Sequence, residues 1–111
     1  MHEMHLNHEP FLTIRNGTKT IELRLLDEKR RNIHVNDFIL FKDCLTHEEI
    51  KVRVVGLHIY PNFYELYKHF DPITLGYSKN EVVHPKDMEE FYPMDLQEKY
   101  GVVGIEIALI N

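Results

Sequence analysis

The sequence predicts an α+β domain, a small mixed or antiparallel β-barrel with short helices packed outside it. Its 111 residues have the length of one domain, and no repeat, low-complexity tract or linker divides them, so we treat residues 1–111 as a single domain. Several predicted strands follow one another directly, whereas a doubly wound parallel sheet needs a crossover helix between successive strands. The sequence therefore favours a barrel over a parallel α/β fold.

Alternating polarity and the positions of proline and glycine indicate the elements of the first half. Pro10 suits the first turn of a helix, because the N–H that it lacks would have no partner there, and Gly17 is a typical stop signal. Ile21, Leu23 and Leu25 alternate with polar residues, as in a half-buried strand. The expected order is a strand at 3–6, a helix that ends at 16–17, a strand at 19–26, a loop at 27–36 and a strand at 38–41.

The second half begins with a long strand at 50–60, which is rich in β-branched residues. The change of phase between Val54 and Val55, beside Gly56, predicts a bulge in it. Asn62 can cap a following helix whose apolar face we expect to be a buried stripe on the barrel. This stripe consists of Phe63, Leu66, Tyr67 and Phe70. Irregular chain at 75–84, short helices at 85–92 and 94–100 and a strand at 102–110 complete the expected order.

The composition, with 43% hydrophobic and 28% charged residues, is typical of a soluble globular protein and excludes disorder as the main state. The single cysteine, Cys44, predicts no disulfide, internal or to a partner, which suits a reducing cytosol. No apolar run approaches the roughly 20 residues of a membrane span, and the first residues lack the apolar core of a signal peptide. We therefore expect a cytoplasmic protein with no membrane contact, no metal ion and no cofactor.

The charge of the chain is unevenly distributed. The net charge is −5, yet the segment from Arg15 to Arg31 holds six basic residues against three acidic ones. A generic polyanion binder would be basic throughout, so this local excess indicates a small anionic ligand or a short stretch of RNA. The alternative is that the segment is only a solvated face.

The segment Gly17-Thr18-Lys19-Thr20-Ile21-Glu22-Leu23-Arg24 is the most informative part of the chain. Glu22 and Arg24 are two apart in a predicted strand, so they point to the same face and can form a charge-assisted pair. Other guanidinium donors then stay free for a carbonyl or a phosphate. Strict alternation places Lys19 on the opposite face, so the strand must begin with a twist or a bulge if the three are to converge. The alternative is a charged solvent face.

This segment resembles the GxKxxExR signature of the ASCH domain, a PUA-like β-barrel named for activating signal cointegrator homology. The similarity spans nearly the whole chain and includes Pro10-Phe11, Asp37, Leu75-Gly76-Tyr77 and the segments 62–67 and 100–105. The resemblance implies a cleft beside the first helix, lined by Lys19, Glu22 and Arg24. Related PUA folds bind RNA, and ASCH domains have been proposed to do so, some of them in connection with RNA cleavage.

One bacterial branch of this family hydrolyses the acetyl amide of acetylated cytidine, using a threonine nucleophile with a lysine and a glutamate. The resemblance matches that lysine to Lys19 and loosely matches the glutamate to Glu81. Glu22 stands where the branch has its threonine, and a carboxylate does not replace a hydroxyl that forms the acyl intermediate. Thr20 shares the face of Glu22 but lies about 6–7 Å away along a strand.

Two hypotheses from different classes therefore remain open. In the first, the cleft binds a nucleoside, a nucleotide or short RNA: Lys19 and Arg24 hold phosphate or base carbonyls, Glu22 orients them, and Tyr60 or Tyr77 stacks on the base. In the second, the domain is a hydrolase acting on a modified nucleoside, or a ribonuclease, with Lys19 and Glu22 as the reacting pair. The absence of the matching nucleophile favours the first.

Two other clusters carry a possible chemistry. His2, His5 and His8 have the spacing H-x-x-H-x-x-H, which invites a metal site, but they cross from a strand into a helix and so point in different directions. Cys44 and His47 could form a thiol site, but they lie in a predicted loop without a third partner. We expect neither cluster to be functional.

Overall fold

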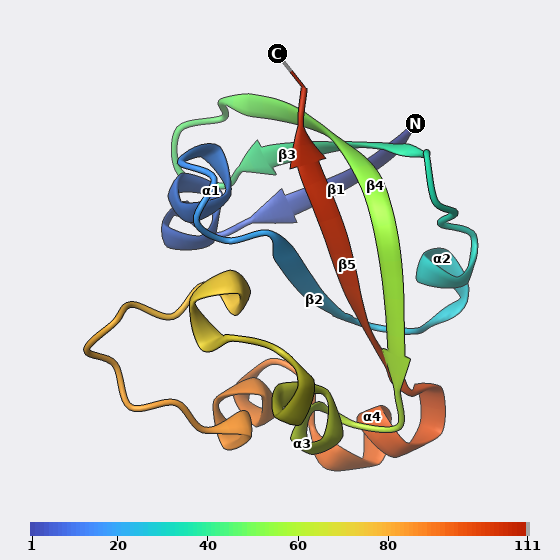
Figure 1. The fold of residues 1–111 in the computed structure, drawn as a ribbon. Coiled ribbons are helices and arrows are strands. Elements are labelled where there is room, and N and C mark those ends of the chain that lie inside the picture. Colours follow the sequence, from blue (N-terminus) through green and yellow to red (C-terminus); the bar gives the residue numbers. More distant parts are fainter. Residues whose placement is uncertain (111) are drawn as a thin grey trace.

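The computed structural model describes residues 1–110, which form one five-stranded sheet with short helices around it (Figure 1). The strands are β1 (His2–Leu6), β2 (Ile21–Leu25), β3 (Phe38–Asp43), β4 (Glu49–Tyr60) and β5 (Val102–Leu109). The helices are α1 (His8–Arg15), α2 (Glu28–Arg31), α3 (Phe63–Leu66) and α4 (Met94–Tyr100), with 3₁₀ segments η1 (Tyr67–His69), η2 (Pro72–Leu75) and η3 (Pro85–Glu90). Across residues 1–110, none of the helices has the length and apolar character needed to cross a membrane.

The strand order in the sheet is β1-β3-β4-β5-β2. β1 and β3 are parallel and the other neighbours are antiparallel, and the sheet curls into a half-barrel, which confirms the predicted mixed sheet and the α+β class. β1 and β2 form the two edges. Across the seam between them, Nη2 of Arg24 donates to the carbonyl oxygen of His5 at 3.0 Å. A side chain of the predicted site thus joins the two edges of the half-barrel.

The predicted bulge in β4 is confirmed. Val54 lies opposite Ile107, but Gly56 lies opposite Glu106, so Val55 is the extra residue in the register. A Cβ atom at Gly56 would lie 3.1 Å from Oε1 of Glu106 and 3.2 Å from Nε2 of His58, so both side chains would have to shift slightly.

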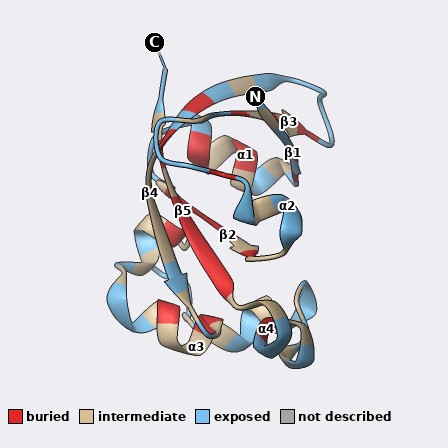
Figure 2. Cartoon of the chain, turned by 90° about the vertical axis from the view of Figure 1, so that its right-hand side faces the viewer, coloured by how far each residue is buried: buried red, intermediate tan, exposed pale blue. Residues whose placement is uncertain are grey.

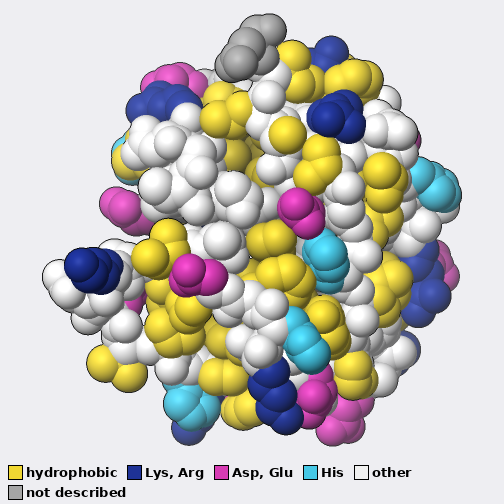
Figure 3. All heavy atoms as spheres, viewed as in Figure 1, with side chains coloured by type: hydrophobic (Ala, Val, Ile, Leu, Met, Phe, Trp, Pro, Cys, Tyr) yellow, Lys and Arg dark blue, Asp and Glu magenta, His cyan; other side chains and the backbone are white. Residues whose placement is uncertain are grey.

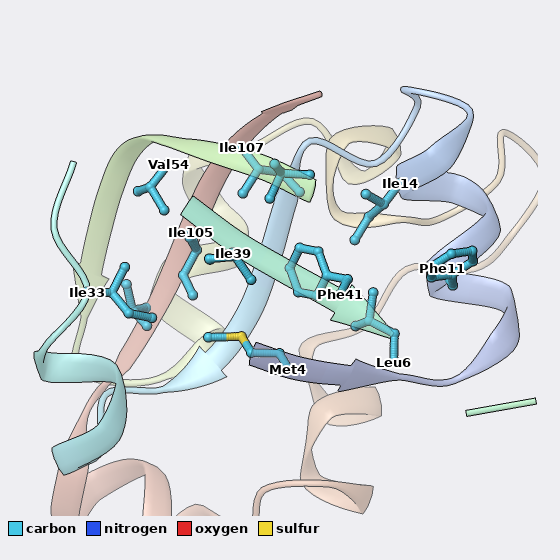
Figure 4. Close-up of a cluster of buried hydrophobic side chains, with 12 residues drawn as sticks. Met4, Leu6, Phe11, Ile14, Ile33, Ile39, Phe41, Val54, Ile105 and Ile107 are labelled. Carbon is cyan, nitrogen blue, oxygen red and sulfur yellow. The ribbon is translucent and has the colours of Figure 1, made fainter. Parts of the chain in front are cut away.

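Two clusters of apolar side chains form the core. The first packs α1 against β1 and β3 (Figure 4) and includes Met4, Leu6, Phe11, Ile14, Ile39 and Phe41. The second packs α3 against β2 and includes Leu23, Leu25, Phe63, Leu66 and Val102. Figure 2 shows that β5 is buried along most of its length, since it contributes to both clusters. The fold therefore holds β2 firmly in place.

The prediction of a loop over 27–36 is wrong in part, because this segment contains α2. The side chain of Asp27 caps the helix by accepting a hydrogen bond from the N–H of Arg30. Aspartate is a preferred N-cap residue, so the sequence carries this signal, but α2 buries no residue and has no apolar face to reveal it.

The predicted stripe that begins at Phe63 is confirmed only in its first half. Asn62 caps α3 as predicted, and Phe63 and Leu66 are fully buried. The α-helix ends at Leu66 and the chain continues as 3₁₀ helix. Tyr67 and Phe70 still pack against the same apolar cluster, but they are only half-buried.

Replacing Leu66 by alanine is expected to lower the free energy of unfolding by about 2–5 kcal/mol, because its side chain is fully buried between α3 and the sheet. Urea unfolding measures the change. Leu45→Ala is the control, because Leu45 is 67% exposed and its truncation should leave the midpoint nearly unchanged. Equal midpoints for the two variants would contradict the packing of α3.

Candidate functional site

A cavity of about 830 Å³ lies between two parts of the chain. One wall comes from the end of β1, α1 and β2, and the other from Tyr67 and the segment 73–92. In Figure 1 that segment, coloured yellow to orange, extends below α1, and in Figure 3 the outline of the molecule is notched above it. The volume falls in the range of about 300–1,000 Å³ that is typical of small-ligand pockets.

Lys19, Glu22 and Arg24 converge on one side of this cavity, as predicted. The Lys19 Nζ lies 3.0 Å from Glu22 Oε1, and the Arg24 Nε donates to Glu22 Oε2 at 2.8 Å. The three side chains are 9%, 5% and 14% exposed, in that order. We call them the floor triad.

The position of Lys19 follows from the turn after α1. The backbone N–H of Lys19 donates to the carbonyl oxygen of Thr13 at 3.0 Å, so Lys19 still belongs to the helix end, and regular strand geometry begins only at Ile21. Gly17, with a φ of 83°, permits this turn. The alternation rule therefore does not apply to Lys19, and its ammonium reaches the carboxylate of Glu22.

The ionised forms of Glu22 and Arg24 are stabilised by the charges beside them. Burial alone would raise the pKa of Glu22, but the charges and hydrogen bonds of Lys19 and Arg24 outweigh it and hold that pKa below its ordinary value. Burial alone would lower the pKa of Arg24, and the Glu22 carboxylate reverses this and raises it. Glu22 is therefore ionised at neutral pH, with each oxygen paired to a cation.

The floor triad keeps donors for a ligand. The ammonium of Lys19 has three N–H groups, and Glu22 is its one ion-pair partner among the described residues. Arg24 uses Nε and Nη2 for Glu22 and His5, and its guanidinium also interacts with Tyr92, which lines the same cavity. Lys19 and Arg24 both line the cavity, so a ligand with acceptor atoms would find paired donors there.

Gly76 lies against Lys19 from the opposite wall. Its φ is 108°, and a Cβ atom there would lie 3.0 Å from Cδ of Lys19. A side chain at position 76 would therefore both strain the backbone and push Lys19 from its place. The glycine lets the two walls meet closely over the lysine stem.

Replacing Gly76 by alanine should cost about 1–2 kcal/mol of unfolding free energy through its left-handed backbone and should shift the side-chain NMR signals of Lys19. Gly17→Ala is the matched control, since Gly17 has a similar φ of 83° with no atom near its missing Cβ. Both variants should lose stability, but only the first should move the Lys19 signals. Identical Lys19 spectra in the two variants would contradict the contact.

Tyr77 lines the cavity, as the sequence predicts, and belongs to a hydrogen-bonded chain. Its hydroxyl lies 2.9 Å from that of Tyr67 and donates to Oδ2 of Asp87 at 2.8 Å. Burial, followed by these hydrogen bonds, raises the pKa of Tyr77 well above its ordinary value. The phenol therefore stays protonated and connects Asp87 of η3 with Tyr67 at the start of η1.

Comparison with known proteins settles the family. The sequence model of the ASCH domain matches residues 4–111. This chain belongs to the ASCH domain family. The crystal structure of hypothetical protein PH0355 is similar to it, with a TM-score of 0.77, 35% identity and 97% of each chain covered. The solution NMR structure of protein PF0455 from Pyrococcus furiosus has a TM-score of 0.70 and 33% identity, over 99% of this chain and 97% of that one. Among curated proteins, none matches.

Tyr60 of this ASCH domain lies elsewhere than predicted. It does not line the main cavity in the described chain; instead its ring stacks on His69 at 4.9 Å and meets Phe70 edge-on. Tyr60 is the last residue of β4, and His69 of η1 lies against its ring. The histidine therefore occupies a face of the ring on which a base would stack. We therefore remove Tyr60 from the candidate site.

The other predicted residues divide between the cavity and the rest of the ASCH domain. Glu81 lines the cavity as an exposed side chain, and its Oε1 accepts from the N–H of Ser78 at 2.8 Å. Thr20 does not line the main cavity but a smaller one of about 220 Å³, which Lys19 also lines. A nucleophilic role for Thr20 in the main cavity therefore has no geometric support.

The histidines and the cysteine are dispersed. His2 bonds to Asp37 at 2.8 Å and His8 bonds to Asp43 at 2.7 Å, whereas His5 lines the cavity. Within residues 1–110 no three potential ligands are close enough to hold a metal ion. The Cys44 side chain also lines the cavity, and His47 lies in the following turn with a φ of 65°.

Sequence reasoning missed part of the cavity wall. Tyr67, which the sequence places in the buried stripe, contributes to the cavity, and no sequence pattern indicates Asp87 or Tyr92, although both line it. The predicted basic segment is also divided: Arg15 pairs with Glu48 at 2.8 Å, and Arg30 pairs with Asp27 at 3.2 Å. Of its six basic residues, Lys19 and Arg24 are the two that line the cavity of the described chain.

Proposed function

We propose that this ASCH domain binds a nucleobase-containing ligand, a nucleoside, a nucleotide or a short stretch of RNA, in the 830 Å³ cavity. The observation that carries this proposal is the floor triad, in which a buried carboxylate holds two cations, the buried Lys19 and the largely buried Arg24, and both cations line the cavity. Membership of a family that is generally linked to RNA binding supports it.

The chemistry of the walls suits a nucleobase. Lysine and arginine donors commonly bind adjacent acceptors on a base edge, such as a carbonyl oxygen and a ring nitrogen. Tyr67, Tyr77 and Tyr92 line the cavity and offer aromatic surface on which a base can stack. A planar ligand with an acceptor edge would thus satisfy both the floor and the wall.

Hydrolysis of a modified nucleoside, or of RNA, is the second candidate. It requires a nucleophile and a group that transfers a proton. Glu22 is held ionised between two cations, so it has no proton to donate, and Thr20 lies outside the main cavity. These features favour binding, and a turnover assay decides between the two.

The test measures binding and turnover with the same preparations. Calorimetric titration measures the affinity for the four common ribonucleosides, their 5′-monophosphates and short single-stranded RNA. Chromatography measures the hydrolysis of acetylated cytidine and of a mixed RNA pool. We expect binding of at least one probe without turnover, and weaker binding by Lys19→Ala. Lys29→Ala is the control, because Lys29 is an exposed lysine on α2 outside the cavity. Absence of binding by every probe would overturn the proposal, and turnover lost in Lys19→Ala would establish the hydrolase instead.

A further inference from the structure

The charges that line the cavity are arranged in two layers. The inner layer is the floor triad, two cations against one carboxylate, whose side chains are at most 14% exposed. The exposed layer consists of Glu9, Glu81 and Asp87 against Lys79. With histidine counted as neutral, the net charge of the inner layer is positive. The net charge of the exposed layer, which we call the mouth of the cavity, is negative. A ligand must therefore pass and occupy an acidic mouth to reach the donors of the floor.

The acidic mouth is not neutralised by the rest of the basic segment. Arg15 is paired with Glu48, and Arg30 is paired with Asp27. Within the described chain, no salt bridge involves Glu9, Glu81 or Asp87. The Glu81 carboxylate accepts from the N–H of Ser78, and the Asp87 carboxylate accepts from the hydroxyl of Tyr77. The three carboxylates therefore lie beside the cavity without a cationic partner.

Lys19 provides an independent sign that a ligand belongs at the floor. Only 9% of its side chain is exposed, and one of its three N–H groups is used in the ion pair with Glu22. Buried donors normally have partners, since an unmet one costs free energy. Lys19 lines the cavity, so a neutral acceptor such as a base carbonyl oxygen or ring nitrogen can pair with its ammonium there.

We propose that the mouth carboxylates Glu9, Glu81 and Asp87 act as a charge filter, so that this cavity selects the uncharged nucleoside and discriminates against its phosphorylated forms. This inference rests on the proposed function and narrows its ligand class. With the base at the floor, the sugar and any 5′-phosphate lie toward the mouth. A phosphate dianion there is repelled, whereas sugar hydroxyls can donate to the carboxylates.

The experiment compares each ribonucleoside with its own 5′-monophosphate by calorimetric titration. For the base that binds, we expect the nucleotide to bind about tenfold more weakly than the nucleoside at low salt, because like charges repel across the partly solvated mouth. The ratio of the dissociation constants of nucleotide and nucleoside should fall toward one in about 1 M NaCl, where the Debye length is only about 3 Å.

A triple variant, Glu9→Gln with Glu81→Gln and Asp87→Asn, tests the residues themselves. It keeps acceptor atoms for Ser78 and Tyr77 but removes three charges, so the nucleotide-to-nucleoside ratio of dissociation constants should fall toward one at low salt. The control removes three exposed carboxylates outside the cavity, by Glu3→Gln, Glu28→Gln and Glu98→Gln, and should keep the parent ratio.

The possible results separate the inference from the function beneath it. A nucleotide that binds the parent as tightly as its nucleoside, or more tightly, overturns the filter but keeps the binding function. A triple variant with the parent ratio, or a control that changes the ratio equally, also overturns the filter. If neither member of any pair binds, the proposed function fails and the filter fails with it.

Discussion

Replacing Glu22 by glutamine is expected to cost about 3–5 kcal/mol of the free energy of unfolding, because it leaves the buried Lys19 and the largely buried Arg24 without their counter-charge. The Glu22 side chain is 5% exposed and contacts Lys19 with one oxygen and Arg24 with the other. Domains of this size have total stabilities of about 5–15 kcal/mol, so the variant should unfold at a much lower urea concentration.

A double variant shows whether charge is the cause. Adding Lys19→Met to Glu22→Gln removes one of the two uncompensated cations and should recover part of the lost stability, which a thermodynamic cycle measures. Glu28→Gln, on the exposed helix α2, is the control for loss of a carboxylate. A Glu22→Gln variant as stable as this control would contradict the burial of the floor triad.

The same carboxylate predicts the response of the parent to acid. The pKa of Glu22 is lowered in the folded state, so its stabilisation is complete above the ordinary pKa of glutamate and is lost as pH falls through the lowered value. Acidification through this range should therefore destabilise the parent more than Glu22→Gln, and the two stabilities should approach each other at low pH.

Replacing Arg24 by lysine should weaken ligand binding by about 10–100-fold, the equivalent of losing one hydrogen bond from a charged group. The guanidinium lines the cavity while it binds Glu22 and the His5 carbonyl, and a single ammonium cannot reproduce this planar set of contacts. Calorimetric titration gives the affinity, and a thermal midpoint shows that the protein remains folded. Parent-like affinity would place the ligand away from Arg24.

The sequence predicts most of the fold because local signals and burial agree. β4 with its bulge at Gly56, the cap at Asn62 and the helix that ends at Gly101 all have signals in the chain. It predicts less where an element has no apolar periodicity, as in α2 after Asp27, or where α-helix changes to 3₁₀, as at Tyr67.

The sequence likewise predicts one wall of the candidate site and not the other. Lys19, Glu22 and Arg24 lie within six residues of one another, so their convergence depends on one turn and one strand. The opposite wall comes from the irregular segment 73–92, where position depends on tertiary contacts such as the Tyr77–Asp87 hydrogen bond. No local pattern predicts those contacts, and none places Tyr60 beneath His69.

The most direct test of ligand binding at the floor triad is an NMR titration of the ¹⁵N-labelled protein with the ribonucleoside that calorimetry selects. We predict that the largest shift changes fall on the side-chain signals of Lys19 and Arg24 and on the backbone amides of Gly76 and Tyr77, which face one another across the cavity. Shift changes confined to the outer face around His58 and Tyr60, with the signals of Lys19 and Arg24 unmoved, would contradict the assignment of this cavity as the binding site.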